Sequence, residues 1–164
     1  MMKSLIAVCL ASMVLGCVGD PPATQFTVEV MNISPAPVSV GLVKTREPKE
    51  EGWTTPADVA IHSPEYSDRH WGELIRPGET KVLGPREGHF QPGSVAVLRV
   101  YGGNPTIDEL MAVGLRDPDR VDVLLPAGQS SYVITIRGGR LTAVRAAEYR
   151  STANKPEGNG TEQR

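Results

Sequence analysis

Apolar and polar residues alternate with a period of two along most of the chain between residues 24 and 147. This alternation is typical of β-strands that bury one face and expose the other. Phe26, Val28 and Val30, for example, share one face of the first predicted strand. About seven such strands, separated by turns rich in glycine and proline, predict an all-β fold, an antiparallel β-sandwich that is either Ig-like or transthyretin-like. The other predicted strands cover residues 38–42, 81–83, 95–101, 121–125, 132–137 and 140–146.

Turn residues and helix-start signals refine this prediction. The Gly-Gly pair at 138–139 tolerates a positive φ and predicts a hairpin between the last two strands. Thr106 and Glu109 fit a capping box ahead of a short helix, and Pro64 fits the first position of another. Segment 46–76 is the least strand-like part of the domain. We interpret it as either a functional loop or an insertion that packs over a sheet edge.

The N-terminal residues have the layout of a secretory signal peptide. Lys3 supplies a positive start, and the apolar run at residues 5–15 is too short to serve comfortably as a membrane-spanning helix. The run ends in Val-Leu-Gly-Cys at residues 14–17, which resembles the lipobox of bacterial lipoproteins. That resemblance implies cleavage before Cys17 and a diacylglycerol on its thiol, with acyl chains such as palmitate attaching the protein to a lipid bilayer. An ordinary cleavable signal or an uncleaved anchor is the alternative interpretation.

The lipobox also divides the chain. Residue Val18, rather than Asp, follows the cysteine, which in enteric-type sorting favours the outer membrane where a cell has one. We therefore expect a protein of the cell envelope. The expected parts are a signal peptide at 1–16, a lipidated tether at 17–23, a β-sandwich domain at 24–147 and a disordered tail at 148–164.

Composition excludes some classes of function. Lys and Arg total 17 against 19 Asp and Glu, a formal net charge of −2, so a basic stripe for nucleic acid is not expected. Aromatic residues make up 5% of the chain, too few for a platform that stacks bases or sugars. Cys9 leaves with the predicted signal peptide and Cys17 is predicted to carry lipid. The domain therefore has no disulfide and depends on its core.

Residues of metal-ligand type crowd in one stretch, which contains His62, Glu65, Asp68 and His70. Imidazole and carboxylate groups suit zinc, so a metal-binding protein or a metal-dependent hydrolase is one hypothesis. The two histidines match no two-histidine helix motif, and exposed loop residues are the other interpretation. The chain also has no Gly-x-Ser-x-Gly nucleophile motif and no phosphate-binding loop. We therefore assign no catalytic residue, no metal ligand and no cofactor, and do not expect an enzyme.

Two further features are candidates for binding. Trp53 and Trp71 both fall in the long segment 46–76, where exposed aromatic side chains are suited to anchor a partner protein. The alternative is that each indole covers the edge of the core. Arg137 and Arg140 face each other across the predicted hairpin, where they either splay apart or bind an anion between them.

Three segments are similar to the outer-membrane lipoprotein of type VI secretion systems. They are residues 35–43, the turn at 77–79 and the strand at 95–101. The resemblance implies a transthyretin-like β-sandwich and a docking role toward a larger inner-membrane protein. The sequence therefore predicts a membrane-anchored envelope lipoprotein whose non-catalytic β-sandwich docks another envelope protein. The metal-dependent function of the His62–His70 segment is the alternative.

Overall fold

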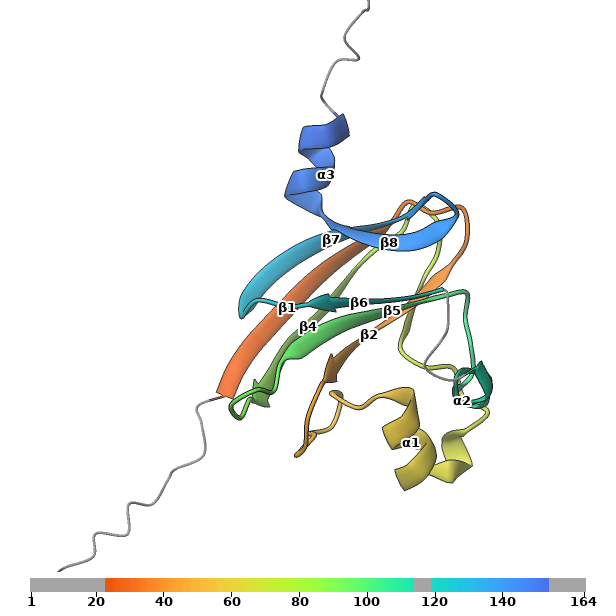
Figure 1. Ribbon diagram of the computed structural model, residues 1–164, viewed down its shortest axis with the longest axis vertical. Helices are drawn as coiled ribbons and strands as arrows, with labels where there is room; N and C mark the ends of the chain where they lie inside the picture. Colours follow the sequence, from red (N-terminus) through yellow and green to blue (C-terminus); the bar gives the residue numbers. More distant parts are fainter. Residues whose placement is uncertain (1–22, 114–118, 154–164) are drawn as a thin grey trace, which may run out of the picture.

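Two four-stranded sheets pack face to face in the computed structural model (Figure 1). The structure describes residues 23–113 and 119–153, so the predicted signal peptide, Cys17, most of the tether and residues 154–164 lie outside the described residues. Sheet A contains, in spatial order, β4 (Thr80–His89), β1 (Ala23–Asn32), β7 (Gly128–Arg137) and β8 (Arg140–Arg145). Sheet B contains, in spatial order, β3 (Glu73–Ile75), β2 (Val38–Lys44), β5 (Ala96–Gly102) and β6 (Arg120–Leu124).

The β-sandwich prediction is confirmed, with one difference in strand direction. β1 and β7 pair in parallel, with Val30 opposite Tyr132, whereas every other pair of neighbouring strands in the two sheets is antiparallel. Sheet A is therefore mixed. Parallel neighbours need a long connection, and here it includes all of sheet B. The alternation of apolar and polar residues within a strand does not indicate which strand it pairs with or in which direction.

The main core lies between the two sheets and consists of the alternating residues that the sequence indicated. Val28 and Val30 of β1 are fully buried, as are Leu98 and Val100 of β5. β5, which is buried on both faces over most of its length, lies between β2 and β6 in sheet B. Burial of such side chains is the dominant favourable contribution to folding.

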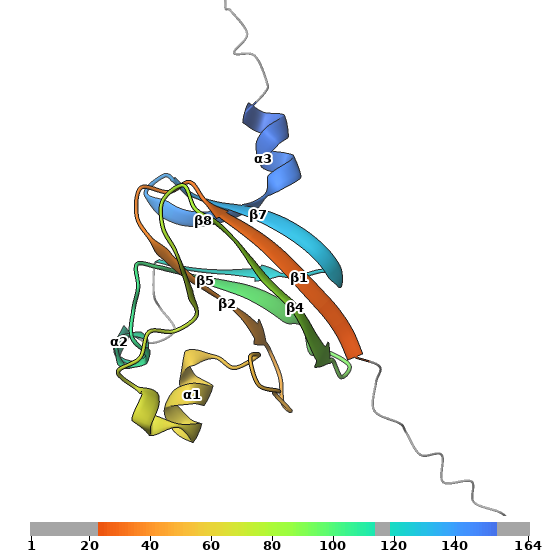
Figure 2. The same cartoon turned by 180° about the vertical axis from the view of Figure 1, so that it is seen from behind.

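A second apolar cluster covers the outer face of sheet B. All seven residues of β2 are buried, because alternate side chains face the main core and this second cluster. The covering segments include α1 (Pro56–His62), η1 (Pro64–Tyr66) and α2 (Ile107–Val113). Figures 1 and 2 both show α1 and α2 beside β2 and remote from β8. The second cluster consists of Val43, Trp71, Val97, Tyr101, Ile107 and Leu110.

The local signals for helices were partly right. The predicted capping box is confirmed, since the amide of Thr106 donates to Glu109 Oε2 at 2.8 Å and the amide of Glu109 donates to Thr106 Oγ1 at 3.2 Å. The helix expected at Pro64 is a single 3₁₀ turn, η1. Sequence reasoning missed α1, which Thr55 caps through a reciprocal pair of hydrogen bonds with Asp58. The signal was present, because Asp58 stands three residues after Thr55.

The first residues of the predicted tail at 148–164 belong to a helix. This helix, α3 (Ala146–Ala153), continues directly from β8, and it buries none of its residues. The hairpin prediction is confirmed: Gly138 and Gly139 have φ of +57° and +77°, and Arg137 pairs with Arg140.

Substituting Gly41 with alanine tests the close packing that the second cluster requires. A Cβ atom on Gly41 would lie 2.6 Å from the ring of Trp71, closer than two carbon atoms approach without displacement. We expect Gly41→Ala to lower the free energy of unfolding by about 1–3 kcal/mol, measured by urea denaturation.

A double-mutant cycle provides the control for this prediction. In a Trp71→Phe background the smaller ring leaves room for the methyl group. Gly41→Ala should then lower the free energy of unfolding much less. An equal cost in both backgrounds would show that the ring contact is not the cause.

Candidate functional site

Both candidate tryptophans are buried, which corrects the expectation of exposed anchors. The side chain of Trp53 is 0% exposed and that of Trp71 is 6% exposed. They lie in different apolar clusters, Trp53 in the main core and Trp71 in the second cluster. The alternative, that each indole covers the core, describes their positions. Trp71 also lies in the lining of a hollow beside η1.

Trp53 attaches the segment after β2 to the edge of sheet A. Its ring packs edge-on against Phe26 and Phe90, with centroids 5.4 and 5.3 Å away. Its Nε1 donates to the carbonyl of Glu87 at 2.7 Å. Arg86 of β4 reinforces this attachment, because its guanidinium donates a hydrogen bond to the carbonyl of Gly52. These bonds use polar groups of the edge strand β4 that would otherwise face solvent.

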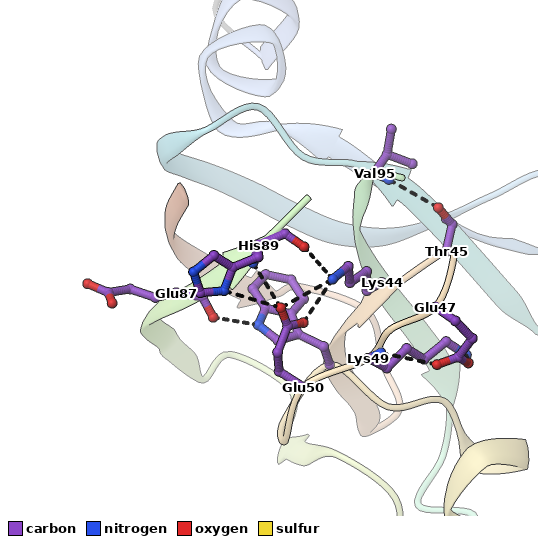
Figure 3. A network of polar contacts seen from close by, with 9 residues as sticks. Lys44, Thr45, Glu47, Lys49, Glu50, Glu87, His89 and Val95 are labelled. Atoms are coloured by element: carbon purple, nitrogen blue, oxygen red, sulfur yellow. Dashed lines mark hydrogen bonds and ion pairs between the residues drawn. The ribbon is translucent and has the colours of Figure 1, made fainter. Parts of the chain in front are cut away.

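A buried lysine forms the centre of the polar network in Figure 3. Lys44, the last residue of β2, is 0% exposed, and its Nζ lies 3.0 Å from Glu50 Oε2. The same Nζ donates to the carbonyl of His89 and lies 5.2 Å from the ring centroid of Phe90. Glu50 Oε1 in turn accepts from the amide of His89 at 2.9 Å. The lysine charge is therefore satisfied within the fold, and we call these three residues, Lys44, Glu50 and His89, the lysine clasp.

The electrostatics of the lysine clasp favour the ionised carboxylate. Burial of Glu50 opposes its ionisation, but hydrogen bonds from the His89 amide and from Lys44 outweigh this effect and lower its pKa. The charged form of Glu50 is thus the form that the folded state stabilises. Nothing in the sequence indicated this network, because Lys44 ends an otherwise uncharged strand.

The residues of the metal hypothesis do not come together. His62, Glu65, Asp68 and His70 are all exposed. In the described part of the chain, no three His, Cys, Asp or Glu side chains gather as metal ligands would. Arg69, which lies between two of the candidates, stacks on Tyr66 with Cζ 3.9 Å from the ring centroid. The structure therefore offers no support for the alternative function.

Two hollows lie beside the segments that cover sheet B, and most of the charged side chains that line them are basic. One, of about 280 Å³, has Arg69, His70 and Arg86 in its lining. The other, of about 410 Å³, is lined by apolar residues of α1 and α2 together with Arg99 and Arg120. Both arginines of the second hollow are already engaged.

An ion-pair group on the outer face of sheet B engages those arginines. Arg99 donates two hydrogen bonds of 2.8 Å to Asp122, and Arg120 donates a third, also of 2.8 Å. Burial opposes ionisation of Asp122, but the bond from Arg99 and the two positive charges lower its pKa. Burial in the same region raises the pKa of Tyr101. This group stabilises the pairing of β5 with β6 and leaves no free carboxylate for a metal.

The sandwich has two distinct ends. We call residues 23–25, 89–95 and 124–128 the Ala23 end, because Ala23 pairs with His89 and β7 starts near it. The opposite end, here the hairpin end, comprises the β1–β2 and β3–β4 turns, residues 102–104 and the glycine hairpin. Figures 1 and 2 show the two ends on opposite sides of the molecule.

Asn32 organises the hairpin end. Its fully buried amide donates to the carbonyls of Ala36 and Ile75 at 2.9 and 3.0 Å. Its Oδ1 accepts from the amide and the hydroxyl of Ser34 at 2.9 and 2.7 Å. The backbone of Asn32 also bonds both ways with the turn at 78–79. An asparagine two residues before a serine, next to prolines, is a turn signal that sequence reasoning could have used.

Each end exposes apolar side chains. At the hairpin end, Ile33 is 37% exposed and Ile136 is 42% exposed. At the Ala23 end, Val95 is 40% exposed and Leu124 is 67% exposed. Within residues 23–113 and 119–153, no helix combines the length and apolar character needed to span a bilayer.

No family model matches this chain. No curated protein matches it either. Among solved structures, the chain is similar to the T6SS lipoprotein TssJ1 from Pseudomonas aeruginosa, with 17% sequence identity and a TM-score of 0.35. The match covers 76% of this chain and 97% of that chain. The β-sandwich itself rests on the strand pairing described above.

Removing the acidic partner of the lysine clasp tests its structural role. Glu50→Ala leaves the buried Lys44 charge with only a carbonyl, so we expect the free energy of unfolding at pH 7 to fall by about 1–3 kcal/mol. Because folding lowers the pKa of Glu50, its contribution is present above the pKa of the unfolded carboxyl, about 4.3, and is lost as pH falls through the folded value. Urea denaturation at pH 7 and pH 3 measures both effects.

Glu47→Ala is the matched control, because this carboxylate also pairs with a lysine but is 74% exposed. It should change stability little at either pH. If Glu50→Ala costs no more than Glu47→Ala at pH 7, the lysine clasp does not stabilise the fold.

Proposed function

We propose that this chain is a membrane-anchored lipoprotein of the cell envelope, whose non-catalytic β-sandwich docks another envelope protein. The observation that carries the proposal is the position of the folded domain relative to the lipobox. β1 begins at Ala23, six residues after Cys17. The predicted acylated cysteine is thus followed almost at once by the sandwich.

Acylation of Cys17 supplies the attachment. Each buried lipid methylene contributes about 0.8 kcal/mol, and a single chain binds membranes only reversibly. The two or three chains that the lipobox resemblance implies give an effectively permanent anchor. The outer membrane is the proposed location in a cell that has one, because Val18 stands where Asp would retain the protein in the inner membrane.

The described polar clusters support a structural rather than a catalytic role. The lysine clasp uses its charges to hold the covering segment against β4, and Asp122 pairs with two arginines on sheet B. In both groups, each charged side chain is bonded to another group of the fold. A general base or nucleophile instead needs a polar atom aimed at a substrate.

The hairpin end is the proposed docking surface, in place of the buried Trp53 and Trp71. It is the end remote from the anchor, so it projects from the membrane toward other envelope proteins. The bonds of Asn32 fix the loop that presents Ile33, and such preorganisation reduces the entropy lost on binding. Ile136, at the same end of the sandwich, lines a hollow of about 170 Å³.

Charge at the hairpin end indicates the chemistry of the partner. Arg76, Arg137 and Arg140 are exposed there, whereas Glu79 accepts a hydrogen bond from the Arg76 amide. We propose a partner protein that places an apolar side chain on Ile33 and Ile136 and carboxylates near the arginines. Charge complementarity of this kind favours encounter and specificity.

Replacing the acylated cysteine tests the anchor. Cys17→Ser removes the thiol that receives the diacylglycerol, so the protein should shift from the membrane fraction to the soluble envelope fraction or remain as uncleaved precursor. Intact mass and metabolic palmitate labelling identify the acyl chains on the original protein. Labelling that persists in Cys17→Ser would contradict the proposed attachment.

Site-specific photocrosslinking tests the docking surface. A benzophenone amino acid at Ile136, in the lipidated protein in its own envelope, should give an adduct of one defined mass. The same residue at Val82, which is 61% exposed on the outer face of sheet A, is the matched control and should give none. An adduct at Val82 but not at Ile136 would reject the hairpin end as the docking surface.

A further inference from the structure

We propose that the Ala23 end of the sandwich rests on the lipid surface, with Val95 and Leu124 inserted at the boundary between headgroups and acyl chains. This contact is additional to the acyl chains of Cys17. It rests on the proposed function, because it requires that Cys17 be anchored. It assigns an orientation to the domain that anchoring alone does not give.

The length of chain between anchor and domain brings this end to the bilayer. Six residue steps separate Cys17 from Ala23, and fully extended they span about 20 Å. β1 alone has ten residues, which corresponds to a length of about 33 Å. The tether is therefore shorter than the sandwich, and the Ala23 end is held closer to the lipid than the hairpin end can be in an upright domain.

The exposed apolar side chains at this end lie on one face. Leu124 of β6 pairs with Val97 of β5, whose side chain belongs to the second cluster on the outer face of sheet B. Val95 precedes Val97 by two residues along the chain, so it faces the same way. Val95 and Leu124 therefore lie on the same face of sheet B as the second cluster and are exposed at the Ala23 end.

The turns that carry these residues are held in place. The amide of Val95 donates to Thr45 Oγ1 at 3.1 Å (Figure 3). The amide of Thr45 donates to the carbonyl of Val95 at 3.2 Å. The amide of Leu125 donates to the carbonyl of Ala96 at 2.9 Å. Fixed apolar side chains at the end that faces the membrane make an insertion surface that does not need to reorganise.

Apolar side chains, rather than charged ones, account for the proposed contact of the Ala23 end with lipid. Arg46 approaches the turn before Val95, where its guanidinium would lie 2.7 Å from a Cβ on Gly93. Glu47 is its exposed neighbour, and Glu87 is exposed near the end of β4. Because cations and carboxylates are both present, a strong preference for anionic lipid is not expected. Vesicles of phosphatidylcholine are therefore the appropriate probe.

Collisional quenching in vesicles tests the orientation. The acylated full-length protein is prepared with a single added cysteine, Val95→Cys, Leu124→Cys or Ile136→Cys, and labelled with the fluorophore NBD. Ile136 is the matched control, because it lies at the hairpin end and is 42% exposed, close to the 40% of Val95. Phosphatidylcholine that carries a doxyl group should quench the labels at 95 and 124 several-fold more strongly than the label at 136.

The outcomes separate the inference from the proposed function. Flotation with vesicles and the mass of acylated Cys17 confirm the anchor in the same samples. With the anchor intact, unquenched labels at 95 and 124 overturn the contact and leave the proposed function standing. Equal quenching of all three labels also overturns it, because the sandwich would then lie on its side. A protein that lacks acyl chains and does not float overturns the proposed function, and this inference with it.

Discussion

Burial of β2 on both faces is the constraint on which the rest of the structure depends. Its seven residues alternate between the main core and the outer face of sheet B, and none is exposed. One sheet packed against another covers only one face, so a second layer must cover the other. The segments after β2 and after β5 form that layer. Trp71 fits there because Gly41 has no side chain to hold it away from the strand.

The same constraint explains the lysine clasp. β2 ends in Lys44, which is as buried as the apolar residues before it, and a buried charge needs a partner and hydrogen bonds. Glu50 and the carbonyl of His89 supply them from a loop and from sheet A. Their positions fix the first part of the covering segment, and Trp53 then closes over the core edge beside Phe26 and Phe90. A single buried cation therefore joins both sheets and the second layer.

Features of the fold that depend on neighbouring residues could be predicted from the sequence. The strands, the glycine hairpin and the capping box of Thr106 and Glu109 each depend on residues within a few positions of one another. The parallel pairing of β1 with β7 depends on segments a hundred residues apart, and no local pattern records it. The burial of the two candidate tryptophans was missed for a related reason. The sequence showed that 46–76 lacks strand alternation, but not that Trp53 closes the edge of the main core while Trp71 covers the outer face of sheet B.

The lysine clasp also links stability to the proposed orientation. His89 lies at the Ala23 end, and Thr45, the residue after Lys44, bonds in both directions with Val95. The network that satisfies the buried charge therefore also sets the position of an apolar side chain proposed to enter the lipid. At the opposite end, Asn32 fixes the loop of Ile33 through its own buried hydrogen bonds. Buried polar groups, and not the core alone, therefore hold both ends of the sandwich, as the proposed role of a rigid spacer between a membrane and a partner protein requires.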